Sequence, residues 1–322
     1  FRDYNMSYAQ NGLIEATDFN NLVGATVETG ANKLNTTWST GGTTAGYGQS
    51  AVSQVSAGTT VIATGQWNSL VTNTASAATH QGSSITSVTA PTAGGTVTYL
   101  SAIPTNLTTI YNNRRNAASQ GSTIADTATR ASSWQNGLTF THTITFASGD
   151  AARWFFNSGG QIKMTASHPS GSGINLLFSD LASDTGTVTM SAPNSGTISI
   201  ASTNYSGITK VGGGGNTPTV DANKGYFGLS TSNATAFTQL ADSGPSGYLS
   251  SFIRYIVKSN GAQQSNGDTG SVITIYSVWD EIPNDLVASA SSAVTCTVQL
   301  PETTNLSASW GTPSIAGAVS GS

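Results

Sequence analysis

The chain has 322 residues, enough for two domains that each bury a core of their own. Charged residues make up only 8% of it, against a usual share of about 25%. The net charge is −4, and Arg114-Arg115 is the only adjacent basic pair, which excludes the basic surface of a nucleic-acid-binding protein. No apolar run approaches the roughly 20 residues of a membrane span.

The first part of the chain, residues 1–128, is predicted to be a small helical region. A helix is expected to open near Thr17 as N-cap, and its apolar residues fall near helical spacing as one stripe: Phe19, Leu22, Val23, Val27, Leu34 and Trp38. Gly24 and Gly30 weaken this helix, so packing must hold it. A loop rich in Gly and Thr follows over residues 39–49. The first residue is Phe1, with no signal peptide before it, and we expect the sequence to begin inside a longer gene product.

The second predicted helix repeats the opening of the first. Phe19-Asn-Asn-Leu-Val aligns without gaps with Trp67-Asn-Ser-Leu-Val, and a third helix is expected over residues 104–118. Gly82 and Gly121 stand where a left-handed residue would end the second and third helices. These similarities predict a degenerate helical repeat with too few units for a solenoid.

This region also lacks charge. Between Lys33 and Arg114 the chain has no Asp, Glu, Lys or Arg for 80 residues. Since a solitary soluble domain normally keeps charge on its surface, we interpret this stretch as a surface covered by neighbouring subunits. The alternative is that Ser, Thr and Asn solvate it adequately.

From residue 129 the pattern is that of an antiparallel β-sandwich. Apolar residues alternate with Thr from Leu138 to Phe146, and residues 152–165 read as a central hairpin that reverses at Gly159-Gly160. A short helix over residues 174–181 is expected to cover the sheet. Further strands are predicted at residues 187–190, 197–200, 226–229, 237–240, 252–257, 272–279 and 293–300. The fold class is therefore α+β, with residues 1–128 helical and 129–322 a sandwich.

Several of these segments resemble the virion proteins of tailed bacteriophages. The segments are Ala152-Arg-Trp-Phe-Phe-Asn-Ser-Gly-Gly-Gln-Ile162, Trp279-Asp280, the closing segment of residues 301–317, Gly46-Tyr-Gly-Gln49 and His80-Gln-Gly82. They are packing and turn motifs. The resemblance implies a multimeric, non-enzymatic component of the tail-fibre, tail-tip or baseplate-associated type, located in the virion and bound to other virion proteins and copies of itself.

No residue pattern predicts a cofactor, a metal ligand set or a catalytic group. His80, His142 and His168 are scattered, without a second His or Cys at metal-ligand spacing, and His80 is interpreted as structural at a helix end. The single cysteine, Cys296, is expected to be a buried, inert thiol on a strand. Residues 212–215 are a Gly loop without the Lys-Ser/Thr of a phosphate site, and the serines, such as Ser170, lack a nucleophile elbow.

Carboxylates and aromatics leave two alternatives open. Asp280-Glu281 could pair with Asp150, Asp180 or Asp184 as glycosidase carboxylates in a polysaccharide depolymerase, although solvated or turn-forming acids are more common. The segment from Asp180 to Asp184 lacks the alternating oxygen ligands of a Ca²⁺ loop. A carbohydrate-binding sandwich that recognises a host-surface glycan would need exposed aromatics, whereas Trp38, Trp67 and Trp154 are interpreted as core.

Overall fold

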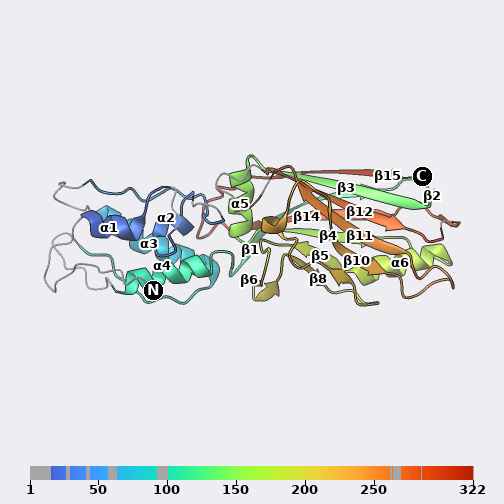
Figure 1. Cartoon of the computed structure of the whole chain (residues 1–322), viewed down its shortest axis with the longest axis horizontal. Coiled ribbons are helices and arrows are strands. Elements are labelled where there is room, and N and C mark those ends of the chain that lie inside the picture. Colours follow the sequence, from blue (N-terminus) through green and yellow to red (C-terminus); the bar gives the residue numbers. More distant parts are fainter. Residues whose placement is uncertain are drawn as a thin grey trace.

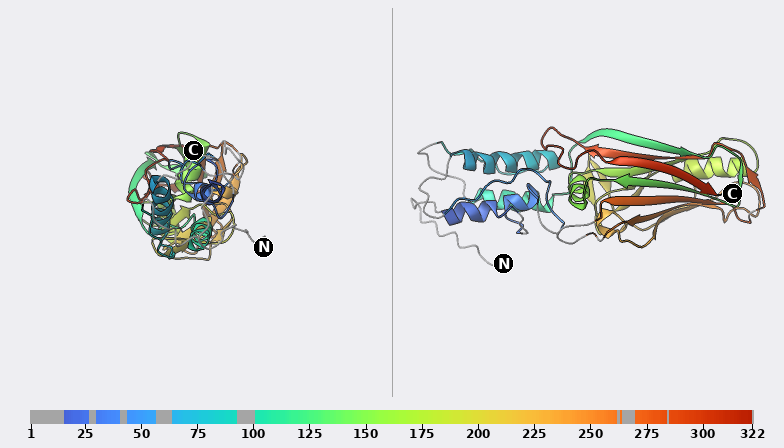
Figure 2. Two further views of the ribbon diagram at one scale, coloured as in Figure 1. Left: turned by 90° about the vertical axis from the view of Figure 1, so that its left-hand side faces the viewer. Right: turned by 90° about the horizontal axis from the view of Figure 1, so that it is seen from above.

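The computed structural model describes residues 16–26, 30–40, 44–56, 64–92, 101–261, 263, 270–283 and 285–321. The molecule is elongated, with helices at one end and two sheets at the other (Figures 1 and 2). This mixture of helices and antiparallel sheets confirms the α+β class. None of the described helices has the length and apolar character needed to cross a membrane.

The helices lie in both parts of the chain. They are α1 (Ala16–Val23), α2 (Leu34–Thr37), α3 (Thr64–Gln81), α4 (Ala102–Asn112), α5 (Gly149–Asn157), α6 (Ile174–Thr185) and the 3₁₀ turn η1 (Tyr226–Gly228).

Two large sheets make up the second part. One has the order β1 (Gln120–Thr129), β14 (Ala293–Pro301), β4 (Gln161–Ser167), β5 (Thr187–Met190), β8 (Ile208–Val211). The other has the order β15 (Ser314–Gly321), β3 (Gly137–Thr145), β12 (Val272–Asp280), β11 (Phe252–Ser259), β10 (Ala234–Leu240), β9 (Thr219–Val220). Two small pairs join β13 (Val287–Ala288) to β2 (Trp134–Gln135) and β6 (Ile198–Ile200) to β7 (Thr203–Tyr205).

The two sheets pack face to face as a sandwich. Strand β3 shows why: Leu138, Phe140, His142 and Ile144 are buried while the alternating Thr side chains are not, as predicted. Side chains of both sheets line one void of only about 10 Å³, among them Ile162 and Met190 from one sheet and Val257 and Ile275 from the other. The inner faces of the two sheets therefore meet through these apolar side chains.

In the helical region, the repeated aromatic positions meet. The Phe19 and Trp67 rings pack edge to face with centroids 5.2 Å apart, so the repeated motif places one aromatic from each helix in a shared core. The predicted single stripe is interrupted, because α1 ends at Val23 and Gly24 adopts a φ of 77°. Leu34 is buried on the separate helix α2, and Val27 lies outside the described residues.

Asparagine side chains hold the irregular segments of this region. Asn20, Asn35 and Asn106 each accept a backbone N–H through Oδ1 and donate through Nδ2 to the carbonyl of the same residue: Val55, Val52 and Thr86 respectively. Each amide therefore imitates a neighbouring strand. This explains how a segment without charges satisfies its buried backbone groups.

The predicted central hairpin is wrong in its first arm. Residues Gly149–Asn157 form helix α5, in which Ala151, Ala152, Phe155 and Phe156 are buried. Ser148 caps the helix by accepting a hydrogen bond from the Ala151 N–H at 3.0 Å. The run of large residues was taken as a strand, but its buried positions follow helical spacing. The second arm is strand β4, where Ile162 and Met164 are buried as expected.

Other boundaries also differ. The strand predicted at residues 226–229 is absent, since residues 226–228 form the turn η1, and Thr17 lies inside α1 instead of capping it. Helix α4 ends at Asn112, and residues 120–128, assigned from sequence to the helical region, form most of β1 and pair with β14. Gly121 is therefore a strand residue, whereas Gly82 does end α3 with a φ of 68°. The Ser- and Thr-rich composition of β1 hides its strand period, since few of its residues are buried.

Candidate functional sites: a polar junction and a carboxylate cluster

Helix α5 joins the sandwich to the helical region (Figure 1). One face is apolar: the Phe156 ring stacks on Tyr226 with centroids 4.5 Å apart. The other face is polar. Arg153 Nη2 and Trp154 Nε1 donate to the Thr40 carbonyl at 2.9 and 3.2 Å, and Asn157 Nδ2 donates to the Gly46 carbonyl at 3.1 Å. These bonds span more than 100 residues of sequence, so α5 is a connector between the two parts.

A second connection is a buried carboxylate–histidine pair. Glu302 Oε1 lies 2.8 Å from His80 Nδ1, at the end of α3, and both side chains are buried. Glu302 Oε2 also accepts from the Thr304 N–H, and Asn305 Nδ2 donates to Oε1 at 3.2 Å. The bond with His80, together with those from Asn305 and Thr304, outweighs burial and lowers the pKa of Glu302 to about 2.

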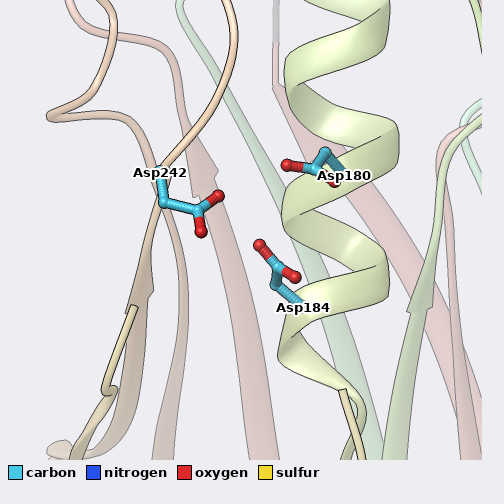
Figure 3. Close-up of side chains that lie close together, drawn as sticks. All are labelled: Asp180, Asp184 and Asp242. Atoms are coloured by element: carbon cyan, nitrogen blue, oxygen red, sulfur yellow. The ribbon is translucent and has the colours of Figure 1, made fainter. Parts of the chain in front are cut away.

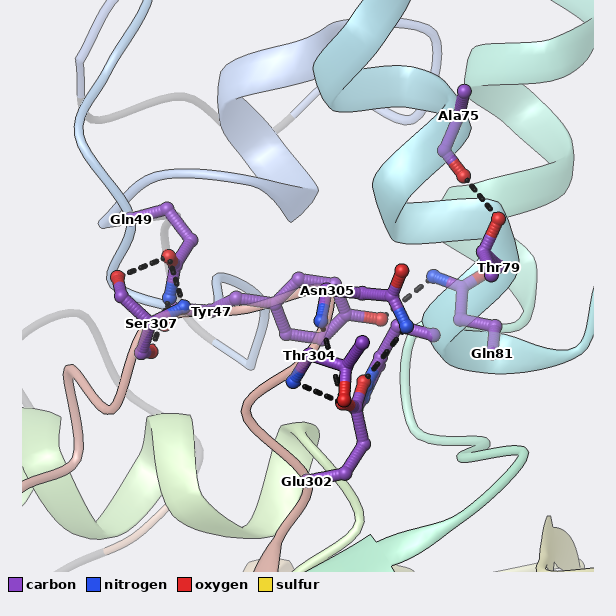
Figure 4. Close-up of polar contacts among 10 residues, drawn as sticks. Tyr47, Gln49, Ala75, Thr79, Gln81, Glu302, Thr304, Asn305 and Ser307 are labelled. Carbon is purple, nitrogen blue, oxygen red and sulfur yellow. Dashed lines mark hydrogen bonds and ion pairs between the residues drawn. The ribbon is translucent and has the colours of Figure 1, made fainter.

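A third connection runs through the loop of residues 44–49. Gln49 exchanges hydrogen bonds with Ser307, donating to its carbonyl at 2.9 Å and accepting from its N–H at 2.9 Å (Figure 4). Tyr47 is fully buried, receives a hydrogen bond on its hydroxyl from Gln81 Nε2 at 2.6 Å, and has its pKa raised by burial. Ser309 Oγ donates to the Tyr47 carbonyl.

We call these three connections together the polar junction: residues 40, 44–49, 80–82, 153–157 and 302–309. It includes residues from four of the five sequence segments that carry the resemblance, among them Gly46-Tyr47-Gly48-Gln49 and His80-Gln81-Gly82, whereas Trp279-Asp280 pairs with the far end of β3. Gly48, with a φ of 71°, lies so close to Trp154 that a Cβ would stand 2.4 Å from the indole ring. The turn motifs therefore serve contact between the helices and the sandwich.

A second cluster lies at the other end of the sandwich. Asp180 and Asp184 are one turn apart on α6, and Asp242 follows β10 from the opposite side (Figure 3). Ligand oxygens of the three carboxylates lie within 4.8 Å of one another, the one such group among the described residues. Burial first, and then the charges of Asp180 and Asp242, raise the pKa of Asp184 to about 6.

Sequence reasoning named two members of this cluster and missed Asp242. The spacing of Asp180 and Asp184 was a partial signal, because two Asp residues at i and i+4 on a helix repel each other unless a positive charge lies nearby. Asp242 lies 58 positions beyond Asp184 in the sequence, and only the pairing of β10 with the sheet brings it close.

The two other histidines lie apart from both sites in sandwich packing. His142 is buried on β3, 4.0 Å from Asp126 Oδ2, and burial lowers its pKa against the opposing effect of that carboxylate. His168 lies 2.8 Å from Ser292 Oγ and 3.1 Å from Asn175 Oδ1, and burial lowers its pKa too.

The glycosidase pairing of Asp280 with Asp150 is contradicted by the strand register. Asp280 pairs with Gly137 at one end of β3, whereas Asp150 follows the other end, Thr145, about 26 Å away along the strand. Glu281 is 1% exposed and Asp280 is half-buried, with its pKa raised by burial. Neither belongs to the cluster on α6.

Aromatic side chains in the described part are mostly internal. Every described Trp and Phe is buried except Trp154, which is half-buried at the polar junction. The described tyrosines are buried or half-buried. The exposed stacking surface that a carbohydrate-binding sandwich requires is therefore not found among these residues.

The remaining residues that the sequence singled out are structural. Cys296 is fully buried on β14, as predicted, and burial raises its pKa to about 12. The guanidinium groups of Arg114 and Arg115 lie over the Tyr111 and Phe227 rings, at 4.3 and 4.1 Å, and so pack against aromatics.

No protein-family model, curated protein or solved structure matches the chain.

Proposed function

We propose that the chain is a structural subunit of a tailed-phage particle, of the tail-fibre, tail-tip or baseplate-associated type, that acts through contacts with copies of itself and other virion proteins. The assignment to a phage particle rests on the sequence resemblance. The observation that carries the assembly role is the uncharged surface of α3 and α4. Its partners are proteins, its location is the virion, and no catalytic step is required of it.

The exposed positions of α3 are small and uncharged: Gly65, Asn68, Thr72, Ala75 and Thr79. Their hydroxyl groups are already bonded within the helix, since Thr79 Oγ1 donates to the Ala75 carbonyl at 2.9 Å (Figure 4). Helix α4 repeats the arrangement, with Thr108 and Thr109 donating to the carbonyls four residues earlier at 2.9 Å each.

Such a surface costs little to bury. A charged side chain loses several kcal/mol of hydration when it is covered without a partner, whereas a hydroxyl that keeps its internal bond loses much less. A cleft of about 420 Å³ between α3 and α4, lined by residues that include Val71, Ile85 and Ile103, gives this face relief into which another surface can fit.

The polar junction supports the same role, because it fixes the helical face relative to the sandwich. Bonds such as that from Gln49 to Ser307 connect residues 258 positions apart. A subunit that docks through its helices and extends its sandwich along the long axis needs this kind of rigid connection.

The test is self-association of the full chain, measured by sedimentation. We expect an oligomer whose dissociation constant rises at least about tenfold in Ala75→Lys, because a lysine has nearly the helix propensity of alanine but places an unpaired charge on the face. The matched control is Ala318→Lys, at an exposed position of the edge strand β15.

A fully folded chain that stays monomeric at high concentration would contradict the proposal. So would equal weakening by the two lysine variants, since that would indicate a general charge effect.

A further inference from the structure

The carboxylate cluster lies beside the seam where the edges of the two sheets meet. Strand β8 is the edge of one sheet and β10 lies next to the edge of the other, and α6 packs beside β10 and β11. Lys210 of β8 reaches across the seam, with Nζ 3.0 Å from Gln239 Oε1 on β10. Asp242, just beyond β10, and Asp184, near the end of α6, therefore lie on two elements that pack against each other beside this seam.

Asp184 is the key member. Its side chain is only 8% exposed, and its Oδ2 accepts no hydrogen bond from the part of the chain that the structure describes. Figure 3 shows its carboxylate directed toward Asp242 and Asp180. A buried carboxylate oxygen without a donor is costly, and it is the kind of group that a cation satisfies.

Among the described residues no N–H or ammonium group donates to Asp184 Oδ2, and the side-chain hydrogen bond of Asp184 is with the Asp242 carboxyl group. The Gly loop closes one side: a Cβ at Gly213 would stand 2.2 Å from the Asp184 carbonyl oxygen, and one at Gly215 would stand 2.3 Å from Oδ2. Lys210 is the neighbouring cation, but its hydrogen bonds go to the uncharged acceptors Gly214 O, at 2.9 Å, and Gln239 Oε1. Three carboxylates and one ammonium leave an excess of negative charge in the cluster.

We propose that Asp180, Asp184 and Asp242 bind a calcium ion. Calcium takes oxygen ligands at about 2.3–2.6 Å, so two ligand atoms of one ion lie up to about 5 Å apart, and the 4.8 Å limit of this cluster fits that range. The donor set is all oxygen, which disfavours zinc and other metals that prefer nitrogen or sulfur. Asp242 is exposed and Asp180 half-buried, so water can complete the coordination.

Calcium fits this arrangement better than magnesium. Magnesium demands a near-ideal octahedron at about 2.0–2.1 Å, whereas calcium accepts irregular sets of six to eight oxygens. Carboxylates from a helix and a loop, together with water, form an irregular set. The ion would tie the end of α6 to the end of β10 and so close the seam.

The experiment is calorimetric titration of the chelator-treated full chain with CaCl₂. We expect saturable binding with a dissociation constant of about 10⁻⁴–10⁻³ M, as in extracellular calcium modules, and weaker binding of MgCl₂. Asp184→Asn and Asp242→Asn are expected to weaken calcium binding at least about tenfold. Asp285→Asn, which changes an exposed carboxylate outside the cluster, is the control and is expected to bind like the parent chain.

Asp242→Asn keeps the test decisive if Asp184→Asn fails to fold, because Asp242 is exposed. A second readout is the thermal unfolding midpoint, which should rise with CaCl₂ in the parent chain and in Asp285→Asn but not in Asp242→Asn. Absence of saturable binding up to about 10 mM CaCl₂, or unchanged binding in Asp242→Asn, would overturn the proposal. Magnesium binding as tight as calcium binding would overturn the choice of ion.

Discussion

Replacing Glu302 with glutamine removes the charge at the centre of the polar junction. Glutamine keeps the shape and an acceptor oxygen for the Asn305 amide, but it loses the negative charge that faces His80 and places an NH₂ group where Oε2 accepts from the Thr304 N–H. The pKa of Glu302 falls from its ordinary 4.5 to about 2 in the folded chain. Since each pKa unit corresponds to about 1.4 kcal/mol, this difference in pKa corresponds to about 3 kcal/mol of folding stability.

The pH range follows from the sign of this shift. A carboxyl group whose pKa is lowered by folding contributes fully above its unfolded pKa of 4.5, and the contribution is lost as the pH falls toward about 2. The parent chain should therefore lose about 3 kcal/mol more than Glu302→Gln when the pH is lowered from 6 to 2. Urea unfolding followed by tryptophan fluorescence, at several pH values, measures this difference.

The control is Asp285→Asn, which removes an exposed carboxylate and should leave the pH dependence like that of the parent chain. If the stability curves of the parent chain and Glu302→Gln run parallel from pH 6 to pH 2, the buried pair is not the source of the stability that the structure assigns to it.

Three further predictions concern packing. Gly48→Ala should lower the free energy of unfolding by at least about 2 kcal/mol in thermal or urea unfolding, because φ is 71° and the new Cβ would stand 2.4 Å from the Trp154 ring. An unchanged unfolding midpoint would mean that the loop and Trp154 move apart freely. Phe156→Ala should cost about 3–5 kcal/mol by the same measurement, since the ring is fully buried and stacks on Tyr226, and a loss below about 1 kcal/mol would contradict that packing. Cys296 should resist thiol reagents in the folded chain at pH 8 and react once urea unfolds it, and rapid labelling without denaturant would show that β14 opens locally.

The β-sandwich could be predicted from sequence because its strands bury one face and expose the other. The alternation from Leu138 to Phe146 carries that period clearly and agrees with the structure. Residues 187–190 also form the predicted strand, although three consecutive side chains of it are buried. The β1 strand could not be predicted this way, because it lies at a sheet edge where only Ala128 is buried and most of the exposed positions are Ser or Thr. Helix α5 was missed because its run of large residues also fits a strand, although Ser148 offered a capping signal.

The sites depend on contacts between distant segments, which no local pattern encodes. The approach of His80 to Glu302 and of Asp184 to Asp242 results from how the helices and strands pack, and a single sequence gives no measure of such distances. Individual members were recognisable: His80 as a structural residue at a helix end, and the Asp pair on α6. Their partners became evident only with the fold.

The order in which the chain is synthesised gives the polar junction a further consequence. A domain that emerges from the ribosome can fold only with the residues already synthesised. Glu302 is synthesised 222 residues after His80, so their contact can form only late in synthesis. Strand β14 is also late in the chain, yet it lies between β1 and β4 in its sheet. A product that stops before about residue 293 therefore has a divided sheet and helices without their attachment, so only finished chains can present a rigid subunit for assembly.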